Sequence, residues 1–126
     1  MILIAEDVFG PAGDGSYSNE TILLVGTFEV ATAEAALRSA GRRFMMVDET
    51  GVEHPSYDSL EDAEEEGLYS PNYVSDPSPK AEGIEMYVDC KGEVEEPMGL
   101  AFRRILVEEL EAAGLNDVSI TNSTGE

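Results

Sequence analysis

The chain has 126 residues, of which 42% are hydrophobic, and its 27 acidic and seven basic residues give a net charge of −20 at pH 7. This length fits one domain that folds alone, which excludes a second independent core. A surface this negative repels phosphates and anionic lipids, which excludes direct binding to nucleic acid or to membranes and favours a basic protein surface as the partner.

The first two predicted elements are strands over residues 2–9 and 21–30, joined by a turn-rich connection over residues 10–19. The centre of the second strand, Ile22–Val25, is continuously apolar. Such a run is typical of a central strand that is covered on both faces.

A short helix is predicted next. Thr32 is a suitable N-cap residue, and Gly41 is a suitable residue to end the helix. The apolar run Phe44–Val47 then predicts a third strand, which ends at a polar turn.

Residues 52–82 are interpreted as an acidic and proline-rich insertion. Asp58 or Ser59 can cap a helix that Gly67 ends. This helix is expected to be marginal, because only two apolar residues anchor it. Residues 70–79 contain three prolines, which lack an N–H donor, so they are predicted to form a loop. His54 is interpreted as a solvated loop residue.

The last third of the chain has the clearest pattern. Apolar residues alternate with polar ones from Ile84 to Cys90, which predicts a strand with one buried face. A long helix is predicted from Pro97 to Gly114, with Leu115 completing its C-terminal cap. A final short strand contains Val118 and Ile120, and residues 122–126 are predicted to be a frayed tail.

This order of elements predicts a single α+β domain over residues 1–126. The expected architecture is a two-layer sandwich, in which two helices pack on one face of an antiparallel sheet. It corresponds to the ferredoxin-like plan with an extra N-terminal strand.

Three observations predict a cytoplasmic protein. The single Cys90 cannot form an intramolecular disulfide, which favours a reducing compartment. The first residues have no basic region of the kind that opens a signal peptide. No apolar run approaches the roughly 18 residues that a membrane-spanning helix needs, so no membrane partner is expected.

Glu109 is the one anomalous residue of the long helix, because it falls near the centre of the apolar arc. One interpretation is a proton-transfer group with a raised pKa or an anchor for an arginine of a partner. The other interpretation is a structural ion pair with Arg38, Arg42 or Arg43. No second titratable group completes an acid/base pair, so we expect no catalytic residues, no metal site and no cofactor, and the protein is predicted not to be an enzyme.

Two acidic clusters are the candidate partner-binding residues, and one helix face is a candidate interface. The clusters are Asp58, Glu61, Asp62, Glu64, Glu65 and Glu66 in the insertion, and Glu108, Glu109 and Glu111 in the long helix. The candidate interface contains Leu100, Arg103, Arg104 and Val107 on the outer face of that helix. Arg104 is also placed to pair with Glu108 one turn later.

These features favour a small acidic, non-enzymatic protein that docks on a basic partner surface. A sharper version is a nucleic-acid mimic, because helix carboxylates at i, i+3 and i+4 lie about 5–6 Å apart and can imitate phosphates. Phage inhibitors of defence systems act in this way, and the composition of this chain resembles theirs.

Two alternatives remain open. One is a structural component of a virion or another symmetric assembly, for which the outer helix face and the insertion would supply contacts between copies, so oligomerisation is left open. The other is a halophilic protein, whose charge preserves solubility in high salt and says nothing about a partner.

Overall fold

The computed structural model describes residues 2–6, 8, 19–48, 50–55, 72–90 and 96–122. Within these residues the chain forms a mixed six-stranded sheet and two helices, which confirms the predicted α+β class. The elements are β1 Leu3–Ile4, β2 Asn19–Gly26, α1 Val30–Phe44, β3 Asn72–Val74, β4 Ser78–Pro79, β5 Ile84–Cys90, α3 Glu96–Ala112 and β6 Val118–Asn122.

The strands lie in the order β1-β6-β2-β5-β3, and β4 also pairs with β5. The central strand β2 is antiparallel to both of its neighbours, β5 and β6. At one edge, however, β1 runs parallel to β6, with Leu3 opposite Ser119. The predicted purely antiparallel sheet is therefore wrong at this edge. A parallel pair needs a long connection between its strands, and nearly the whole chain separates β1 from β6.

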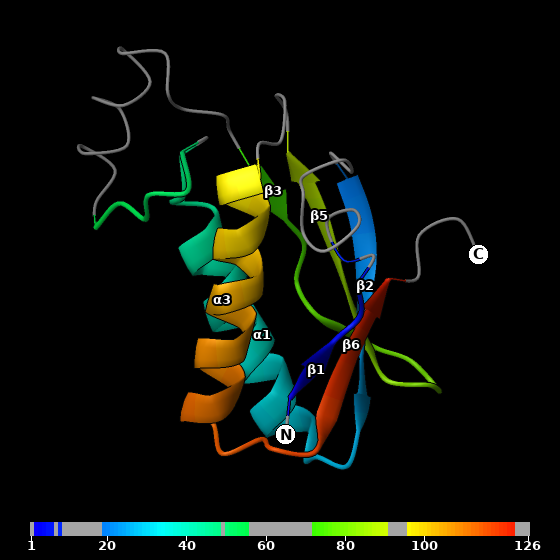
Figure 1. Ribbon diagram of the computed structural model, residues 1–126. Coiled ribbons are helices and arrows are strands. Elements are labelled where there is room, and N and C mark those ends of the chain that lie inside the picture. Colours follow the sequence, from blue (N-terminus) through cyan, green and yellow to red (C-terminus); the bar gives the residue numbers. More distant parts are fainter. Residues whose placement is uncertain are drawn as a thin grey trace.

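Both helices lie on the same side of the sheet and pack against each other (Figure 1). The ring centroids of Phe44 in α1 and Phe102 in α3 are 4.6 Å apart. Alternate strand residues point toward the helices, so the core lies between the two layers. The buried core residues of the sheet include Ile22, Leu24, Ile84, Met86, Val88, Val118 and Ile120.

The opposite side of the sheet, called the open face below, carries the residues that alternate with these buried ones. Ile22 and Leu24 of β2 are fully buried, whereas Leu23 and Val25 are partly exposed on the open face. The prediction that this run is covered on both faces is therefore wrong for the described residues. The strand is central, as predicted, but its second face is not fully covered.

The last third of the chain follows the sequence pattern closely. The predicted strand from Ile84 to Cys90 is β5, and the predicted long helix is α3. Gly114 follows α3 with a φ of 80°, a conformation that favours glycine. The N–H of Leu115 donates to the carbonyl of Leu110 over 3.0 Å, as the expected C-terminal cap requires. The final strand is also confirmed.

The end of α1 differs from the prediction. Gly41 does not end the helix but lies buried inside it, and a Cβ atom there would come within 2.8 Å of Val74 Cγ1. Gly41 therefore serves close packing between α1 and β3. Phe44 is the last residue of α1, and Val47 forms only an isolated bridge with Glu53, so the predicted strand Phe44–Val47 is wrong.

The strand that lies beside β5 instead is β3, in a segment predicted to be a loop. It fits between prolines because it spans only Asn72–Val74, which contains none. The buried amide of Asn72 donates to the carbonyls of Phe44 and Val47, over 3.1 and 3.2 Å. These bonds tie β3 to the end of α1, a long-range contact that local sequence patterns do not reveal.

Several other predicted boundaries also differ from the structure. The first predicted strand is only Leu3–Ile4, and the second ends at Gly26, because Val30 already begins α1. Glu29, rather than Thr32, occupies the N-cap position of α1. Asn122, predicted to begin the frayed tail, is the last residue of β6. The predicted connection over residues 10–19 is wrong at its last residue, because Asn19 begins β2; its other residues and the helix of the insertion lie outside the described residues.

Candidate partner-binding site

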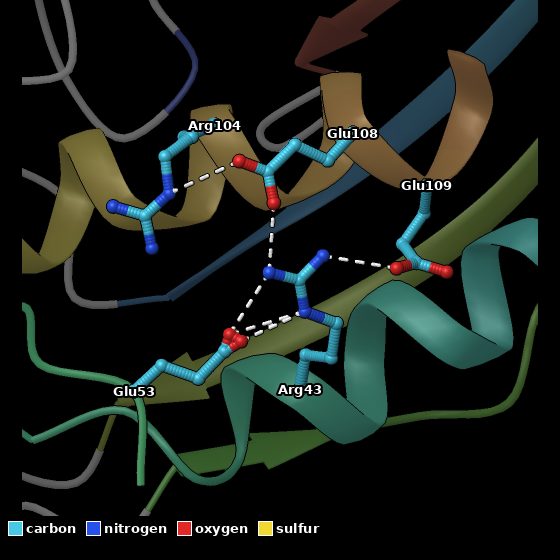
Figure 2. A network of polar contacts seen from close by, with 5 residues as sticks. All are labelled: Arg43, Glu53, Arg104, Glu108 and Glu109. Carbon is cyan, nitrogen blue, oxygen red and sulfur yellow. Dashed lines mark hydrogen bonds and ion pairs between the residues drawn. The ribbon is translucent and has the colours of Figure 1, made fainter. Parts of the chain in front are cut away.

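Arg43, in the last turn of α1, is the centre of a network that joins three parts of the chain (Figure 2). Its Nε donates to Glu53 over 2.8 Å, its Nη2 to Glu108 over 2.8 Å and its Nη1 to Glu109 over 2.9 Å. All three nitrogens of the guanidinium are therefore engaged by carboxylates. The hydrogen bonds that Arg43 donates to Glu53 raise the pKa of Arg43; burial opposes this change, and Glu108 and Glu109 reinforce it, so the side chain stays charged.

Glu109 lies at the contact of α1 and α3, with 21% of its side chain exposed. Its hydrogen bond with Ser39 lowers the pKa of the carboxyl; partial burial opposes this change, and Arg43 reinforces it. Of the two interpretations, the structural pair with an arginine is confirmed. The other interpretation, a proton-transfer group with a raised pKa, is wrong, because the pKa of Glu109 is lowered.

Glu108 is shared between two arginines. Besides Arg43, it pairs with Arg104 one helical turn earlier, at 3.6 Å, as the sequence spacing predicted (Figure 2). The five residues of this network, Arg43, Glu53, Arg104, Glu108 and Glu109, are called the arginine network below. Its three carboxylates face two guanidinium groups, so most of its charge is neutralised within the chain.

Next to the network, Asp48 organises a tight turn. One oxygen of its carboxylate accepts bonds from Thr50 N at 2.9 Å, Thr50 Oγ1 at 2.6 Å and Val52 N at 3.2 Å. The other oxygen lies 2.8 Å from Nε2 of His54. Burial raises the pKa of Asp48, but the hydrogen bonds from Thr50, His54 and Val52 outweigh it and hold the pKa below its ordinary value.

The prediction that His54 is a solvated loop residue is wrong, because only 11% of its side chain is exposed. The turn also uses Gly51 at a φ of 82°. Sequence reasoning missed this arrangement, although the spacing of Asp48, Thr50 and Gly51 is typical of a turn in which an aspartate binds its own backbone. It likewise missed Glu20, a buried carboxylate of β2 that accepts a hydrogen bond from Asn122 over 2.8 Å.

The candidate interface on α3 lies beside the N-terminal strand. Arg103, Arg104 and Val107 line a groove of about 550 Å³ together with Ile2, Ile4 and Glu108. Arg103 also works within the chain, since it donates to the carbonyls of Ala5 and Val8 over 2.9 and 3.1 Å. Leu100 is exposed on the same helix but does not line this groove.

Of the other predicted partner-binding residues, one lies within the described part of the chain and six lie outside it. Glu111 is exposed near the end of α3. The insertion cluster, Asp58, Glu61, Asp62, Glu64, Glu65 and Glu66, lies outside the described residues. The role of the insertion cluster and of the α3 cluster as binding surfaces stays a prediction.

Two kinds of feature are absent from the described residues. No group of three or more histidine, cysteine or acidic side chains is arranged there to hold a metal ion. No helix in that part of the chain is long and apolar enough to cross a membrane.

The charged side chains of the network and of the turn bind groups of the same chain. Glu109 and Asp48 have lowered pKa values and are ionised at neutral pH, so neither is poised for proton exchange there. Arg43 and Arg104 hold carboxylates of the same chain, and Arg103 holds backbone carbonyls. Any function has to be argued from this chemistry, because comparison of the chain with protein families, curated proteins and solved structures found no match.

Proposed function

We propose that this protein is a small, non-enzymatic binding protein that docks through its acidic surface on a basic surface of a partner protein. The observation that carries the proposal is that most of the described arginines bind groups of the same chain. Arg38, Arg43 and Arg104 pair with carboxylates of the same chain, and Arg103 binds backbone carbonyls. Among the described residues, this leaves Arg42 and Lys80 to offset the acidic surface of a chain whose net charge is −20.

The acidic side chains outside these pairs support the same proposal. Among the described residues, exposed carboxylates outside these pairs occur on α3 and at several connections; they include Glu6, Glu29, Glu82 and Glu111. Together they support a broad negative field, which attracts a positively charged protein face and speeds its encounter. A nucleic-acid mimic is the sharper form of this proposal, with a DNA-binding protein as the partner.

Salt and DNA competition test the proposal. A basic partner captured from the native source is purified and titrated with this protein by calorimetry at 50 to 500 mM KCl. We expect the affinity to fall steeply with salt, and duplex DNA to displace the protein if it is a mimic. Affinity that does not change with salt would contradict electrostatic docking.

A second candidate function is a contact role in a symmetric assembly. The groove between β1 and α3 favours it, because apolar Ile2, Ile4 and Val107 lie there beside two arginines. Sedimentation at several protein concentrations tests it, and a strictly monomeric protein would contradict it.

We further propose the ferredoxin-like plan for the fold and the cytoplasm as the location. The strand order β6-β2-β5-β3, with one helix after β2 and the other after β5, supports the plan, and β1 is then the extra strand. The single cysteine of the chain supports a reducing compartment.

A further inference from the structure

Two tyrosines and two carboxylates lie together on the open face of the sheet. Ile84, Met86 and Val88 of β5 are buried toward the helices, so the alternating residues Glu85, Tyr87 and Asp89 point the other way. On β3, the side chain of Asn72 reaches the end of α1, so the next residue, Tyr73, also points to the open face.

The pairing of β3 with β5 brings these residues side by side. Tyr73 lies directly opposite Asp89, and Tyr87 is the diagonal neighbour of Tyr73 on the same face. Such diagonal positions are about 7–8 Å apart, within reach of aromatic side chains. Tyr73, Glu85, Tyr87 and Asp89 are called the tyrosine patch below.

The tyrosine patch is accessible and has apolar residues beside it. Tyr73 is 52% exposed and Tyr87 is 37% exposed. Leu23 of β2 lies opposite Glu85, and Val25 follows on the same strand, both partly exposed. The sequence of β2 is apolar enough for a strand with two covered faces, so this surface is suited to be covered by a partner.

The charge of the open face selects the chemistry of that partner. The described strand residues that point to this face are Leu3, Thr21, Leu23, Val25, Tyr73, Ser78, Glu85, Tyr87, Asp89, Ser119 and Thr121, and none of them is lysine or arginine. On the helix side, Glu108 pairs with both Arg43 and Arg104. A ligand of the open face therefore has to bring positive charge of its own.

We propose that the tyrosine patch binds arginine side chains of an extended basic segment of the partner protein. This inference rests on the proposed function and names the surface that performs it. A guanidinium is planar and weakly hydrated, so it stacks on a tyrosine ring while its N–H groups donate to a neighbouring carboxylate. Lysine offers neither the plane nor the fork of donors. Stacked nucleic-acid bases are the weaker alternative, because the carboxylates and the net charge of −20 repel phosphates.

The test uses the full chain and three fluorescent probes. These are an eight-residue peptide of alternating arginine and serine, the same peptide with lysine in place of arginine, and an eight-nucleotide single-stranded oligothymidylate. Binding is measured by anisotropy at 50 mM KCl. We expect the arginine peptide to bind several-fold more tightly than the lysine peptide, and the oligonucleotide not to bind.

Four variants locate the site. Glu85→Gln should weaken binding of the arginine peptide about tenfold, whereas the matched control Glu111→Gln on α3 should change it less than about twofold. Tyr73→Leu removes the ring and should weaken binding about fivefold, while Tyr73→Phe keeps the ring and should bind like the original protein. Circular dichroism and thermal unfolding check that each variant is folded.

The outcomes separate this inference from the proposed function. If Glu85→Gln and Glu111→Gln weaken binding equally, charge alone attracts the peptide and the tyrosine patch is not the site, although acidic docking stands. If neither peptide binds, both proposals are contradicted. Binding of the oligonucleotide that is lost in Tyr73→Leu would overturn the inference in favour of a nucleic-acid surface.

Discussion

The arginine network and the tyrosine patch both contain glutamate, but in opposite situations. In the network, Glu53, Glu108 and Glu109 hold the guanidinium of Arg43 at the contact between α1 and α3. In the patch, Glu85 lies among exposed tyrosines on a strand face whose described residues include no lysine or arginine. The sequence shows carboxylates in both places. It does not show that an arginine reaches those of the network across the contact between the helices.

This difference separates two uses of negative charge. Where an arginine reaches the carboxylates, they join secondary-structure elements and contribute to folding. Where the surroundings are aromatic and partly exposed, they are suited to a ligand. The predictions below test this separation through its effect on stability, from the largest change to the smallest.

Replacing Arg43 should destabilise the protein most. Arg43→Ala leaves three carboxylates close together at a site where the arginine was only 29% exposed. We expect a loss of about 2 kcal/mol in the free energy of unfolding, below the range for a fully buried pair. Urea unfolding measures it. Arg42→Ala removes the same charge from an exposed neighbour and should cost less than about 0.5 kcal/mol. Equal losses would show that only net charge matters.

A packing substitution tests which face of β3 is covered. Gly41→Ala places a methyl group within 2.8 Å of Val74 Cγ1. We expect a net loss of about 1.5 kcal/mol, because overpacking outweighs the gain in helix propensity. In double variants, Val74→Ala should relieve the loss, whereas Tyr73→Leu, on the open face, should not. Relief by Tyr73→Leu would place the tyrosine on the helix side and contradict the description of the patch.

The pH dependence of Glu109 follows from its lowered pKa. A carboxyl whose pKa is lower in the folded protein stabilises it above the ordinary value of 4.5, and the effect is lost as pH falls through the folded value. Glu109→Gln should therefore cost about 1 kcal/mol at pH 7. The difference from the original protein should shrink as pH falls below 4.5, in unfolding curves recorded along a pH series. A difference that persists undiminished at low pH would contradict an ionic role.

The smallest effect should have the opposite sign. Glu111 lies two positions after Glu109, exposed in the last turn of α3, where no basic residue offsets it. Its charge opposes the helix dipole, so Glu111→Gln should raise the stability by about 0.3–0.5 kcal/mol at low salt. The gain should disappear in 1 M KCl, as thermal unfolding can show. A loss of stability would mean that this carboxylate, too, has a partner.

The elements that sequence patterns predicted well are those whose periodicity reflects direct contact with the core. The alternation from Ile84 to Cys90 and the apolar arc of α3 are dictated by burial on one face, and both elements were located within one or two residues. The cap at Gly114 was likewise visible, because a positive φ requires a particular residue type.

The sequence-based predictions were wrong where residues distant in the chain determine the local structure. Gly41 resembled the end of a helix, but its lack of a side chain serves the approach of Val74. A strand was assigned to Phe44–Val47 instead of Asn72–Val74, because the bonds of Asn72 to the end of α1 leave no periodic trace. Glu109 was identified as anomalous and its arginine partner was among three candidates, but the convergence of Glu53 and Glu108 on Arg43 depends on the packing of α1 against α3.

The parallel pair of β1 and β6 governs the order in which this protein can complete its fold during synthesis. Leu3 is made long before its parallel partner Ser119. Arg103, which binds the carbonyls of Ala5 and Val8, is also made late. The segment that contains β1 therefore has to wait until α3 and β6 have been made before it has its neighbours. Such non-local pairing is slow to form, so β1 is expected to join the sheet last.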